Sequence, residues 1–324
     1  MATPMMRAGI ATEAGIGIHE IARPTPTDEQ ILVRVAAAGL NRADLGVAKS
    51  ASGAPLTQVG LEWSGEVVAV GGRVTTVKPG EFVMCTGAGG YAEYAVTDAG
   101  RAIPFDPAQM SPQQAAALPL ALMTAHDALI TRGRLKAGHQ VLVHGATSGV
   151  GLMALQMARL LGAPLIAATS RDAQKRARLA AFGATHVLDA GNASWADELL
   201  RATGNRGVDV VVDMVSGESI NAAMKATSVL GRIVNVGRLG GGVAPFNFDL
   251  HALRRIEYIG VTFRTRSVEE VREIVARMCV DVLPAVHAGK LSLPVDKVFK
   301  LDEAAAAHAA MAANTHFGKI LLVP

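Results

Sequence analysis

Cysteine and aromatic residues are scarce in this chain of 324 residues. Its two cysteines, Cys85 and Cys279, lie far apart and fit no metal-ligand spacing, which excludes a disulfide framework and a cysteine-rich zinc site. So few thiols in so long a chain are typical of a reducing compartment, and we expect a cytoplasmic protein. Because aromatic residues make up only 4% of the chain, its cores must be mainly aliphatic, which suits buried parallel strands packed between helices.

Long apolar runs and large charge clusters are also missing. No uncharged apolar stretch reaches about 18 residues, and the N-terminal residues lack the apolar core of a signal peptide, so we expect no association with a membrane. The net charge is +3, and the basic residues are scattered except in the short segment 171–178, so we expect no nucleic acid partner. At about 150 residues per domain, the length of the chain suggests two domains.

Short strands separated by glycine and proline are expected in the first hundred residues. Apolar and polar residues alternate at 30–35, and three further segments, 64–70, 81–85 and 92–96, are rich in strand-forming residues. This pattern predicts an irregular β-rich domain.

From residue 139 onward, short apolar strands alternate regularly with helices that end in glycine. Such alternation indicates βαβ units, and therefore an α/β fold with a doubly wound parallel sheet. The expected strands are 141–143, 165–168, 186–188, 208–212, 232–236 and 257–263, and the expected helices are 149–161, 172–182, 195–202 and 218–230.

The last sixty residues return to a mixed pattern. It predicts helices at 268–287 and 302–313 and strands at 297–301 and 319–323, and we expect this tail to pack on the first domain. The expected division is therefore a discontinuous β-rich domain, 1–120 with 265–324, into which a cofactor domain, 121–264, is inserted.

The turn between the strand at 141–143 and the helix at 149–161 has the features of a phosphate-binding loop. A pyrophosphate needs exposed N–H groups at a helix N-terminus and small residues that allow it to approach. Small residues occupy the positions of a GxGxxG pattern, and the serine hydroxyl can add a hydrogen bond. The candidate contacts are Ala146, Thr147, Ser148, Gly149, Val150 and Gly151. The alternative is a glycine-rich turn that only permits close packing of helix and strand.

The end of the second strand of the parallel sheet indicates which dinucleotide binds. Enzymes that use NAD place an acidic residue there, and those that use NADP place cationic groups that hold the 2′-phosphate. Ser170 and Arg171 stand at this position, with Lys175 one helical turn away, which favours NADPH. Asp172 is the exception in this cationic segment. We interpret it as the N-cap of the next helix, whereas a side chain directed at the ribose would favour NADH.

Several motifs in the expected order resemble a known family over nearly the whole chain. They are the segments 38–45 (AGLNRADL), 60–71 (GLEWSGEVVAVG), 77–83 (VKPGEFV), 144–151 (HGATSGVG), 208–213 (VDVVVD) and 318–323 (GKILLV). In these segments the chain resembles the medium-chain dehydrogenase/reductase superfamily, and in particular its zinc-independent NADPH:quinone oxidoreductase branch. The resemblance implies a GroES-like catalytic domain, an inserted nucleotide-binding domain of the Rossmann type and a cleft between them.

The resemblance also implies that zinc is absent. Zinc-dependent members of the family have a cysteine at the position of Asn41 and a histidine at that of Leu61, and they hold a second zinc with four clustered cysteines. This chain lacks all of these ligands, and one carboxylate, Glu62, does not make a zinc site. We therefore interpret Glu62 as a structural hydrogen-bonding residue.

The resemblance assigns two catalytic residues and several cofactor contacts. Asn41 should face the nicotinamide and hydrogen-bond the substrate carbonyl or the cofactor, although asparagine is also a common turn residue. Thr124 should lie near the nicotinamide, with the start of a helix as its alternative role. The further cofactor contacts that the resemblance implies are Val236, Gly237, Phe263, Arg264, Asn314 and Lys319.

The activity implied by the resemblance is NADPH-dependent hydride transfer to a quinone or another activated α,β-unsaturated carbonyl. Without a Lewis acid an isolated ketone is hard to polarise, whereas a quinone is already electrophilic. Some enoyl-thioester reductases of the superfamily have a proton-donating tyrosine shortly after the Asn41 position, but 45–50 contains none. Lys49 and His126 are alternative proton donors, and each fits a surface or helix position better.

Two other functions stay open, and one assembly is expected. The chain can be a C=C reductase of the 2-enoyl or haloacrylate type, or a non-catalytic NADPH-binding protein with a structural or RNA-binding role. The strand at 257–263 should lie at the edge of the parallel sheet, where an apolar strand is usually covered or paired. In the family it pairs with its copy, so we expect a homodimer.

Overall fold

The chain folds into two compact units. The computed structural model describes residues 4–12, 15–50 and 57–324. The first unit comprises Met1–Ala121, Ser267–Pro284 and Ser292–Pro324, and the second comprises Leu122–Arg266 and Ala285–Leu291. The second unit thus includes a short segment of the tail, Ala285–Leu291, which the sequence analysis assigns to the first domain. The boundaries of the catalytic and cofactor domains stay a prediction.

The first unit is built on two β-sheets. One has the strand order β15-β16-β3-β5-β6-β8, with β7 also paired to β3, and the other has the order β2-β1-β4. The strands are β1 (Met5–Thr12), β2 (Gly15–Ala22), β3 (Gln30–Gly39), β4 (Thr57–Gln58), β5 (Glu62–Val70), β6 (Phe82–Thr86), β7 (Tyr94–Asp98), β8 (Ala102–Pro104), β15 (Val295–Lys300) and β16 (Lys319–Val323). The helices are α1 (Arg42–Ser50), α2 (Pro112–Ala116), most of α9 (Val268–His287) and α10 (Ala304–Ala313).

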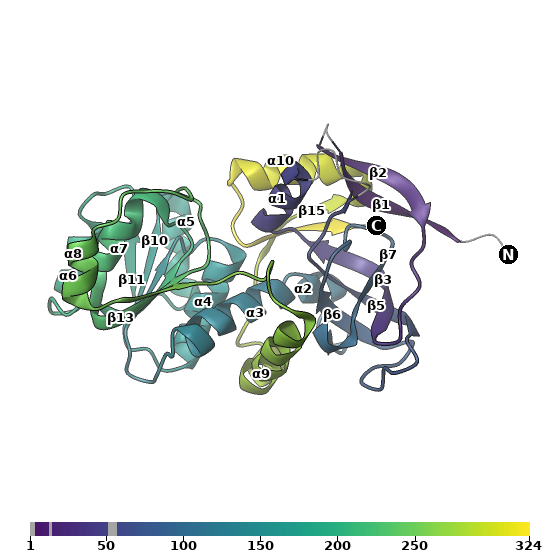
Figure 1. Ribbon diagram of the computed structural model, residues 1–324, viewed down its shortest axis with the longest axis horizontal. Helices are drawn as coiled ribbons and strands as arrows, with labels where there is room; N and C mark the ends of the chain where they lie inside the picture. The colour runs from purple at the N-terminus through teal and green to yellow at the C-terminus, as the bar shows by residue number, and fades with distance from the viewer. Residues whose placement is uncertain (1–3, 13–14, 51–56) are drawn as a thin grey trace. The chain divides into compact units, whose positions relative to one another are not determined.

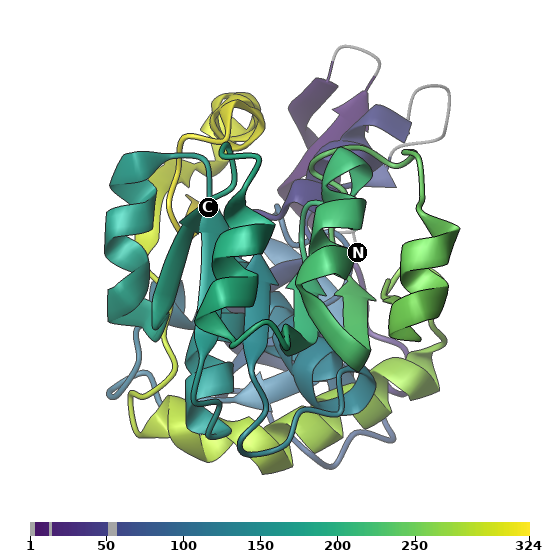
Figure 2. The same cartoon turned by 90° about the vertical axis from the view of Figure 1, so that its left-hand side faces the viewer.

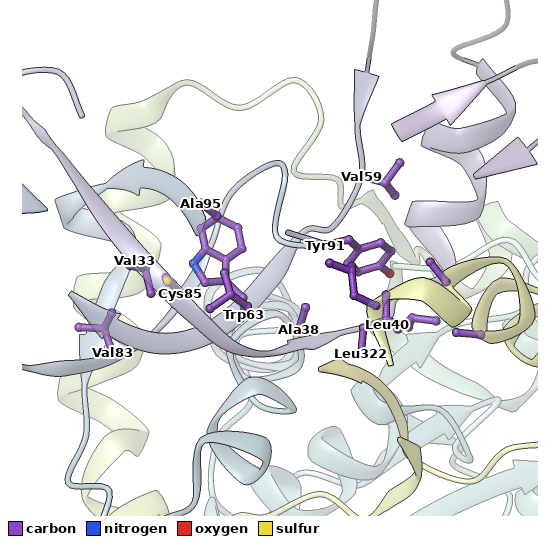
Figure 3. Close-up of a cluster of buried hydrophobic side chains, with 14 of the residues drawn as sticks. Val33, Ala38, Leu40, Val59, Trp63, Val83, Cys85, Tyr91, Ala95 and Leu322 are labelled. Carbon is purple, nitrogen blue, oxygen red and sulfur yellow. The ribbon is translucent and has the colours of Figure 1, made fainter. Parts of the chain in front are cut away.

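The core of the first unit lies against the long sheet. Figure 3 shows its two large aromatic side chains, Trp63 and Tyr91, among aliphatic residues that include Val33 and Leu322. Both rings are almost completely buried, at 0% and 1% exposure. Gly65 on β5 faces β3 so closely that a side chain there would collide with the carbonyl of Arg34. Close strand pairing therefore accounts for this glycine of the 60–71 motif.

The second unit is built on a six-stranded parallel sheet with the order β11-β10-β9-β12-β13-β14. The strands are β9 (Val141–His144), β10 (Ile166–Ser170), β11 (His186–Asp189), β12 (Val208–Asp213), β13 (Thr227–Asn235) and β14 (Glu257–Gly260). The helices are α3 (Pro119–His126, mostly in this unit), α4 (Gly149–Leu160), α5 (Ala173–Arg178), α6 (Trp195–Ala202), α7 (Ile220–Ala226) and α8 (Phe248–Arg254), and a π-helix, η2, covers Asp127–Arg132. The strand order reverses beside β9, which confirms the predicted doubly wound sheet.

Helices cover both faces of the parallel sheet (Figures 1 and 2). Apolar side chains of α6, α7 and α8 form one core with residues of the sheet, and α4 contacts β9 and β10 from the other face. In such sheets ligands bind outside the carboxyl ends of the strands, where the order reverses. That point lies at the carboxyl ends of the neighbouring strands β9 and β12. No helix in the part of the chain that the structure describes is both long enough and apolar enough to cross a membrane.

Several expected elements of the second unit have different bounds. The strand expected at 232–236 begins earlier, at Thr227, and the helix expected at 172–182 is α5 followed by a 3-10 helix at Leu179–Phe182. The helix predicted at 218–230 is only α7, because Thr227 already pairs with Val208 of β12 and begins β13; its hydroxyl donates to the carbonyl of Ala223 (2.7 Å). Leu230, at a φ of +63°, lies in an irregularity of that strand. The strand predicted at 257–263 ends at Gly260, although the next N–H still donates to the carbonyl of Asn235 (2.9 Å).

Candidate functional site

The turn after β9 is tied to the end of β10. Gly145 has a φ of +83°, which favours glycine, and its N–H donates to the hydroxyl of Thr169 (2.9 Å). The next N–H, of Ala146, donates to the carbonyl of Thr169 (3.0 Å). Helix α4 then begins with Ser148 as its N-cap, whose hydroxyl oxygen accepts from the N–H of Gly151 (3.1 Å). The turn therefore has a fixed conformation before any ligand binds.

The small residues of this turn serve either close packing or candidate phosphate binding. A Cβ on Gly151 would lie 2.6 Å from the carbonyl oxygen of Ala146, so this glycine permits close packing of α4 on the turn. Its N–H is already used by Ser148, which leaves the N–H groups of Gly149 and Val150 as candidate phosphate donors. The packing alternative thus applies to one glycine of the motif, while the motif keeps the strand–turn–helix geometry of a phosphate loop.

The segment after β10 shows how the acidic residue of this cationic region is used. The carboxylate of Asp172 accepts from the N–H of Lys175 (3.0 Å) at the start of α5, which confirms our interpretation of it as the N-cap. That hydrogen bond is the main reason that the pKa of Asp172 lies below its usual value. Ser170 is buried at the end of β10, and Arg171 is exposed. One carboxylate oxygen of Asp172 is thus engaged in the helix cap, and the exposed guanidinium of Arg171 can approach a ligand.

Arg176 is a functional candidate that the sequence analysis missed. Its guanidinium donates to the carbonyls of Ser170 (2.9 Å) and Arg171 (2.8 Å), and it forms an ion pair with Asp189 at the end of β11 (3.0 Å). It thereby fixes the backbone that carries the expected 2′-phosphate contacts. The only sequence signal was its place in the basic segment 171–178, where it is indistinguishable from its neighbours.

His144 is a second residue that the sequence analysis did not assign. It is buried at the end of β9, with Nδ1 2.7 Å from the hydroxyl of Thr169 and Nε2 3.0 Å from that of Ser219. Its ring stacks on Trp195, with 4.9 Å between the ring centroids. Burial lowers the pKa of His144, which favours the neutral form of the imidazole. We therefore assign it to the support of the phosphate turn.

Two residues after β13 that we expected to contact the cofactor, Val236 and Gly237, already make hydrogen bonds within the protein. The N–H groups of Val236 and Gly237 both donate to the carbonyl of Asp213 (2.8 and 3.0 Å). A Cβ on Gly237 would lie 2.5 Å from the carbonyl oxygen of Met214, so the loops after β12 and β13 are in close contact. A ligand can therefore contact Val236 and Gly237 through their carbonyl groups or side-chain atoms, but not through these N–H groups.

The expected contacts after β14 lie on a segment held by a buried ion pair. The guanidinium of Arg266 lies over the ring of Phe263 (4.9 Å) and donates to the carboxylate of Asp127 (2.5 Å), which is fully buried in the π-helix. Arg264 is exposed on the same segment. Thr124 lies in α3 and is 6% exposed. The contacts of Thr124, Phe263 and Arg264 with a cofactor stay predictions.

In the first unit, Asn41 is held by two charged side chains. Its side-chain N–H groups donate to Glu62 (2.8 Å) and to the carbonyl of Gly39 (3.3 Å), while its side-chain oxygen accepts from Lys319 (3.0 Å). The ammonium of Lys319 also donates to Glu62 and to the carbonyl of Leu40 (2.9 Å). The second oxygen of Glu62 accepts from the N–H of Leu120 (2.8 Å), so Glu62 is the structural hydrogen-bonding residue that we expected.

This network determines what Asn41 can offer to a ligand. The ammonium faces its oxygen and the carboxylate faces its nitrogen, so the orientation of the amide is fixed by charge. Both amide N–H groups have acceptors, so the hydrogen-bonding capacity that remains is one lone pair of the oxygen. Asn41 can therefore accept a hydrogen bond, but it cannot donate one to a carbonyl without losing an existing contact. Lys319 likewise has three acceptors for its three N–H groups, which makes it a positioning residue in this structure.

A buried carboxyl group lies beside Asn41. One oxygen of Asp44 accepts from the backbone N–H of Asn41 (2.7 Å) and from the hydroxyl of Tyr91 (2.8 Å). Burial raises the pKa of Asp44 to about 7. Asn314, an expected cofactor contact, is exposed at the end of α10 and accepts from Arg42 (2.8 Å). The network around Asn41 therefore includes a group that titrates near neutral pH.

The residues at the expected zinc position do not fit a zinc ion. Leu61 has no donor atom, and the charge of Glu62 is paired with Lys319. Within residues 4–12, 15–50 and 57–324, no three His, Cys, Asp or Glu side chains gather in a way that could hold a metal. The side chain of Lys49, an alternative proton donor, and the residues 51–56 lie outside the described part. His126, the other alternative, is 1% exposed within α3.

Comparisons with known families and proteins find matches in both the N-terminal and the central part of the chain. Residues 27–107 match the alcohol dehydrogenase GroES-like domain, and residues 149–279 match the zinc-binding dehydrogenase family. The quinone oxidoreductase of Pongo abelii is 30% identical over 294 residues, which are 89% of this chain and 87% of that protein. A phenolphthiocerol/phthiocerol polyketide synthase component of Mycobacterium tuberculosis is 32% identical over 311 residues, which are 95% of this chain but only 14% of the synthase component.

Solved structures resemble this chain over nearly its whole length. An Escherichia coli quinone oxidoreductase complexed with NADPH has a TM-score of 0.88 at 25% identity, over 98% of this chain and 100% of its own. An NAD-dependent alcohol dehydrogenase has a TM-score of 0.86 at 29% identity, over 98% of this chain and 100% of its own. The CurK enoyl reductase has a TM-score of 0.84 at 27% identity, over 99% of both chains.

These likenesses extend over the GroES-like unit and the parallel-sheet unit, which confirms the predicted fold class. The chain spans only a seventh of the synthase component but most of the quinone oxidoreductase. The protein therefore belongs to the medium-chain dehydrogenase/reductase superfamily, in its quinone oxidoreductase-like branch.

Proposed function

We propose that the protein transfers hydride from NADPH to a quinone or another activated α,β-unsaturated carbonyl, and that it does so without zinc. The observation that carries this proposal is the ion pair of Glu62 with Lys319 beside Asn41. This arrangement places an ammonium beside Asn41, which stands where zinc-dependent members of the family have a cysteine, and leaves Asn41 as a hydrogen-bond acceptor. Because the site then lacks a Lewis acid, the substrate must be electrophilic before it binds.

NADPH is supported by the segment after β10. Arg171 is exposed there, Lys175 lies within the first turn of α5, and Asp172 is the N-cap of that helix. The NADPH complex of the Escherichia coli relative points to the same cofactor. The nicotinamide supplies the hydride, while this chain holds the pyrophosphate at the N-terminus of α4 and the 2′-phosphate at Arg171 and Lys175.

Asn41 fits this reaction as an acceptor. Its free lone pair can accept from the carboxamide N–H of the nicotinamide or from a hydroxyl of the hydroquinone product. A quinone takes up its proton on oxygen, which exchanges readily with water, so a dedicated carbon acid is not needed. This agrees with the lack of a tyrosine in 45–50.

A C=C reductase of the 2-enoyl type is the second candidate, and the likeness to the CurK enoyl reductase favours it. To separate the two, we suggest following the oxidation of NADPH spectrophotometrically with 1,4- and 1,2-quinones, enones and acrylates. The proposal expects turnover with quinones above all. Turnover confined to enoyl substrates would favour the second candidate, and tight NADPH binding with no turnover at all would indicate a binding protein.

The cofactor assignment has its own test. Replacing Arg171 with alanine should weaken NADPH binding about tenfold and leave NADH binding unchanged, because only NADPH carries the 2′-phosphate. Arg201→Ala, at an exposed position on α6, is the matched control. Isothermal titration calorimetry with both dinucleotides decides the matter, and a wild-type preference for NADH would overturn the assignment.

We further propose a homodimer formed through β14. This strand is the last in the order of the parallel sheet, and Tyr258 on it is 41% exposed. An edge strand of this kind can pair with its copy and so extend the sheet across a twofold axis. Light scattering after size-exclusion chromatography should give twice the chain mass, and Ile259→Pro should give a monomer because proline removes an N–H from the edge.

A further inference from the structure

Ser216, in the loop after β12, has a backbone conformation that a residue with a side chain rarely adopts. Its φ is +55° and its ψ is −144°, and it is 6% exposed. This region of conformational space is open to glycine and strained for serine. Such a conformation persists only where the surroundings impose it, and strained residues of this kind gather at functional sites.

The surroundings of Ser216 do impose it. Its N–H donates to one oxygen of Asp213 (2.9 Å), and its carbonyl accepts from the hydroxyl of Ser219 (2.7 Å). Its own hydroxyl lies within donating distance of the carbonyl of Gly237 (2.8 Å) and of the second oxygen of Asp213 (3.3 Å), and it accepts from the side chain of Asn235. Every polar group of Ser216 therefore has a partner.

These contacts join two loops into one surface, which we call the ledge and define as residues 213–217 and 235–241. The N–H of Gly240 donates to the carbonyl of Val215 (2.7 Å), and that of Leu239 donates to the carbonyl of Met214 (3.3 Å). A side chain on Gly217 would collide with the carbonyl of Gly240. The ledge is therefore a close-packed structure that includes Val236 and Gly237, two of the expected cofactor contacts.

The hydrogen bonds of the ledge continue to both sides along the carboxyl edge of the sheet. On one side, Asn235 donates to the hydroxyl of Tyr258 on β14 (2.9 Å). On the other side, Ser219 lies 3.0 Å from His144 at the end of β9, whose second nitrogen lies 2.7 Å from Thr169 on β10. The polar chain thus connects five of the six parallel strands, and Ser216 stands near its middle.

The strand order assigns the ledge to one half of a dinucleotide. The expected 2′-phosphate contacts follow β10, on one side of the switch point between β9 and β12. The ledge follows β12 and β13, on the other side. A dinucleotide whose pyrophosphate lies on α4 extends across the switch point, so its adenosine half lies over β10 and its nicotinamide half lies over the ledge.

We propose that Ser216 is a positioning residue that holds the ledge in the shape required by the nicotinamide half of the cofactor. This inference rests on the proposed NADPH site. It predicts that loss of the Ser216 hydroxyl weakens binding of the whole dinucleotide and spares binding of its adenosine half. A serine with a merely structural role would not discriminate between the two ligands.

The test compares Ser216→Gly with the wild-type protein in calorimetric titrations with NADPH and with 2′,5′-ADP, which contains only the adenosine half. Glycine adopts the backbone conformation without strain, so this variant should fold, while the hydroxyl contacts are lost. We expect about a tenfold weaker affinity for NADPH and an unchanged affinity for 2′,5′-ADP. Ser216→Ala, which keeps the strain, should show an effect at least as large.

Thr203→Val is the matched control. The Thr203 hydroxyl, at the C-terminus of α6, makes hydrogen bonds only to the backbone around it, with Leu199, Leu200 and Gly207. It should lower the urea midpoint without changing either affinity. Equal losses for both ligands, or no loss for NADPH in Ser216→Gly, would overturn the inference. If the wild-type protein binds neither ligand, the proposed function itself fails, which is a different result.

Discussion

The two units hold their candidate site residues by different means. In the first unit, Asn41 is oriented by a buried ion pair, because Glu62 and Lys319 contact opposite ends of its amide. In the second unit, the ledge around Ser216 is held by hydroxyl groups, an amide and backbone groups, with Asp213 as the charged member. One unit thus depends on a pair of opposite charges, and the other on many weaker contacts.

The comparison teaches how each unit should respond to substitution. Removal of one partner from a buried ion pair leaves an uncompensated charge, which costs several kcal/mol. Removal of one neutral hydrogen bond from a network costs about 1 kcal/mol, because the other contacts remain. We therefore expect loss of a charged partner in the first unit to affect folding, and loss of a neutral contact in the second to affect mainly ligand binding.

The largest effect is expected from Lys319→Met. The substitution leaves Glu62 charged and unpaired in a buried position, and it should lower the free energy of unfolding by about 3–5 kcal/mol. Urea unfolding followed by circular dichroism measures this change. Lys297→Met, at an exposed position on the neighbouring strand β15, is the control. The double variant with Glu62→Gln should recover part of the loss, and no recovery would show that charge is not the cause.

The pH dependence of Asp44 should be nearly as large. Its pKa rises from an ordinary value near 4 to about 7 on folding, so the folded state binds the proton more tightly than the unfolded state. The free energy of unfolding therefore falls as the pH rises from about 4 to about 7, by up to about 1.4 kcal/mol per pH unit, and is constant above that window. Urea unfolding of the wild-type protein and Asp44→Asn across this window measures the difference.

Asn can keep both hydrogen bonds of Asp44 without a charge, so the variant should lose this contribution to the pH dependence. Asp28→Asn, at an exposed position, should behave like the wild-type protein. A stability difference between wild type and Asp44→Asn that does not vary with pH would show that Asp44 has an ordinary pKa.

The smallest effect is expected from Asn41→Ala. It removes one acceptor for the cofactor or substrate, and kcat/KM should fall about tenfold, which corresponds to about 1.4 kcal/mol. Asn192→Ala, at an exposed turn, should leave kcat/KM unchanged. If Asn41→Ala were fully active, the lone pair of Asn41 would have no part in the reaction, although the contrast between the two units would stand.

Sequence patterns predicted the parallel sheet well because its strands and helices are set by local periodicity and by glycine at helix ends. They failed at 218–230, where apolar residues suit both helix and strand, and only the pairing of β13 with β12 decides between them. The N-cap role of Asp172 followed from its place before a helix. The contacts of Glu62 and Lys319 did not, because 257 positions separate them and only the fold brings them together.

The two tryptophans of the chain have a practical consequence, because each unit contains one. Trp63 lies within the aliphatic core of the first unit, and Trp195 stacks on the imidazole ring of His144 in the second. Indole emission is sensitive to exposure and to an adjacent imidazole, so the two emit from different surroundings. A pair of single-tryptophan variants would give each half of the molecule its own optical signal, and would show whether the halves melt together or one after the other.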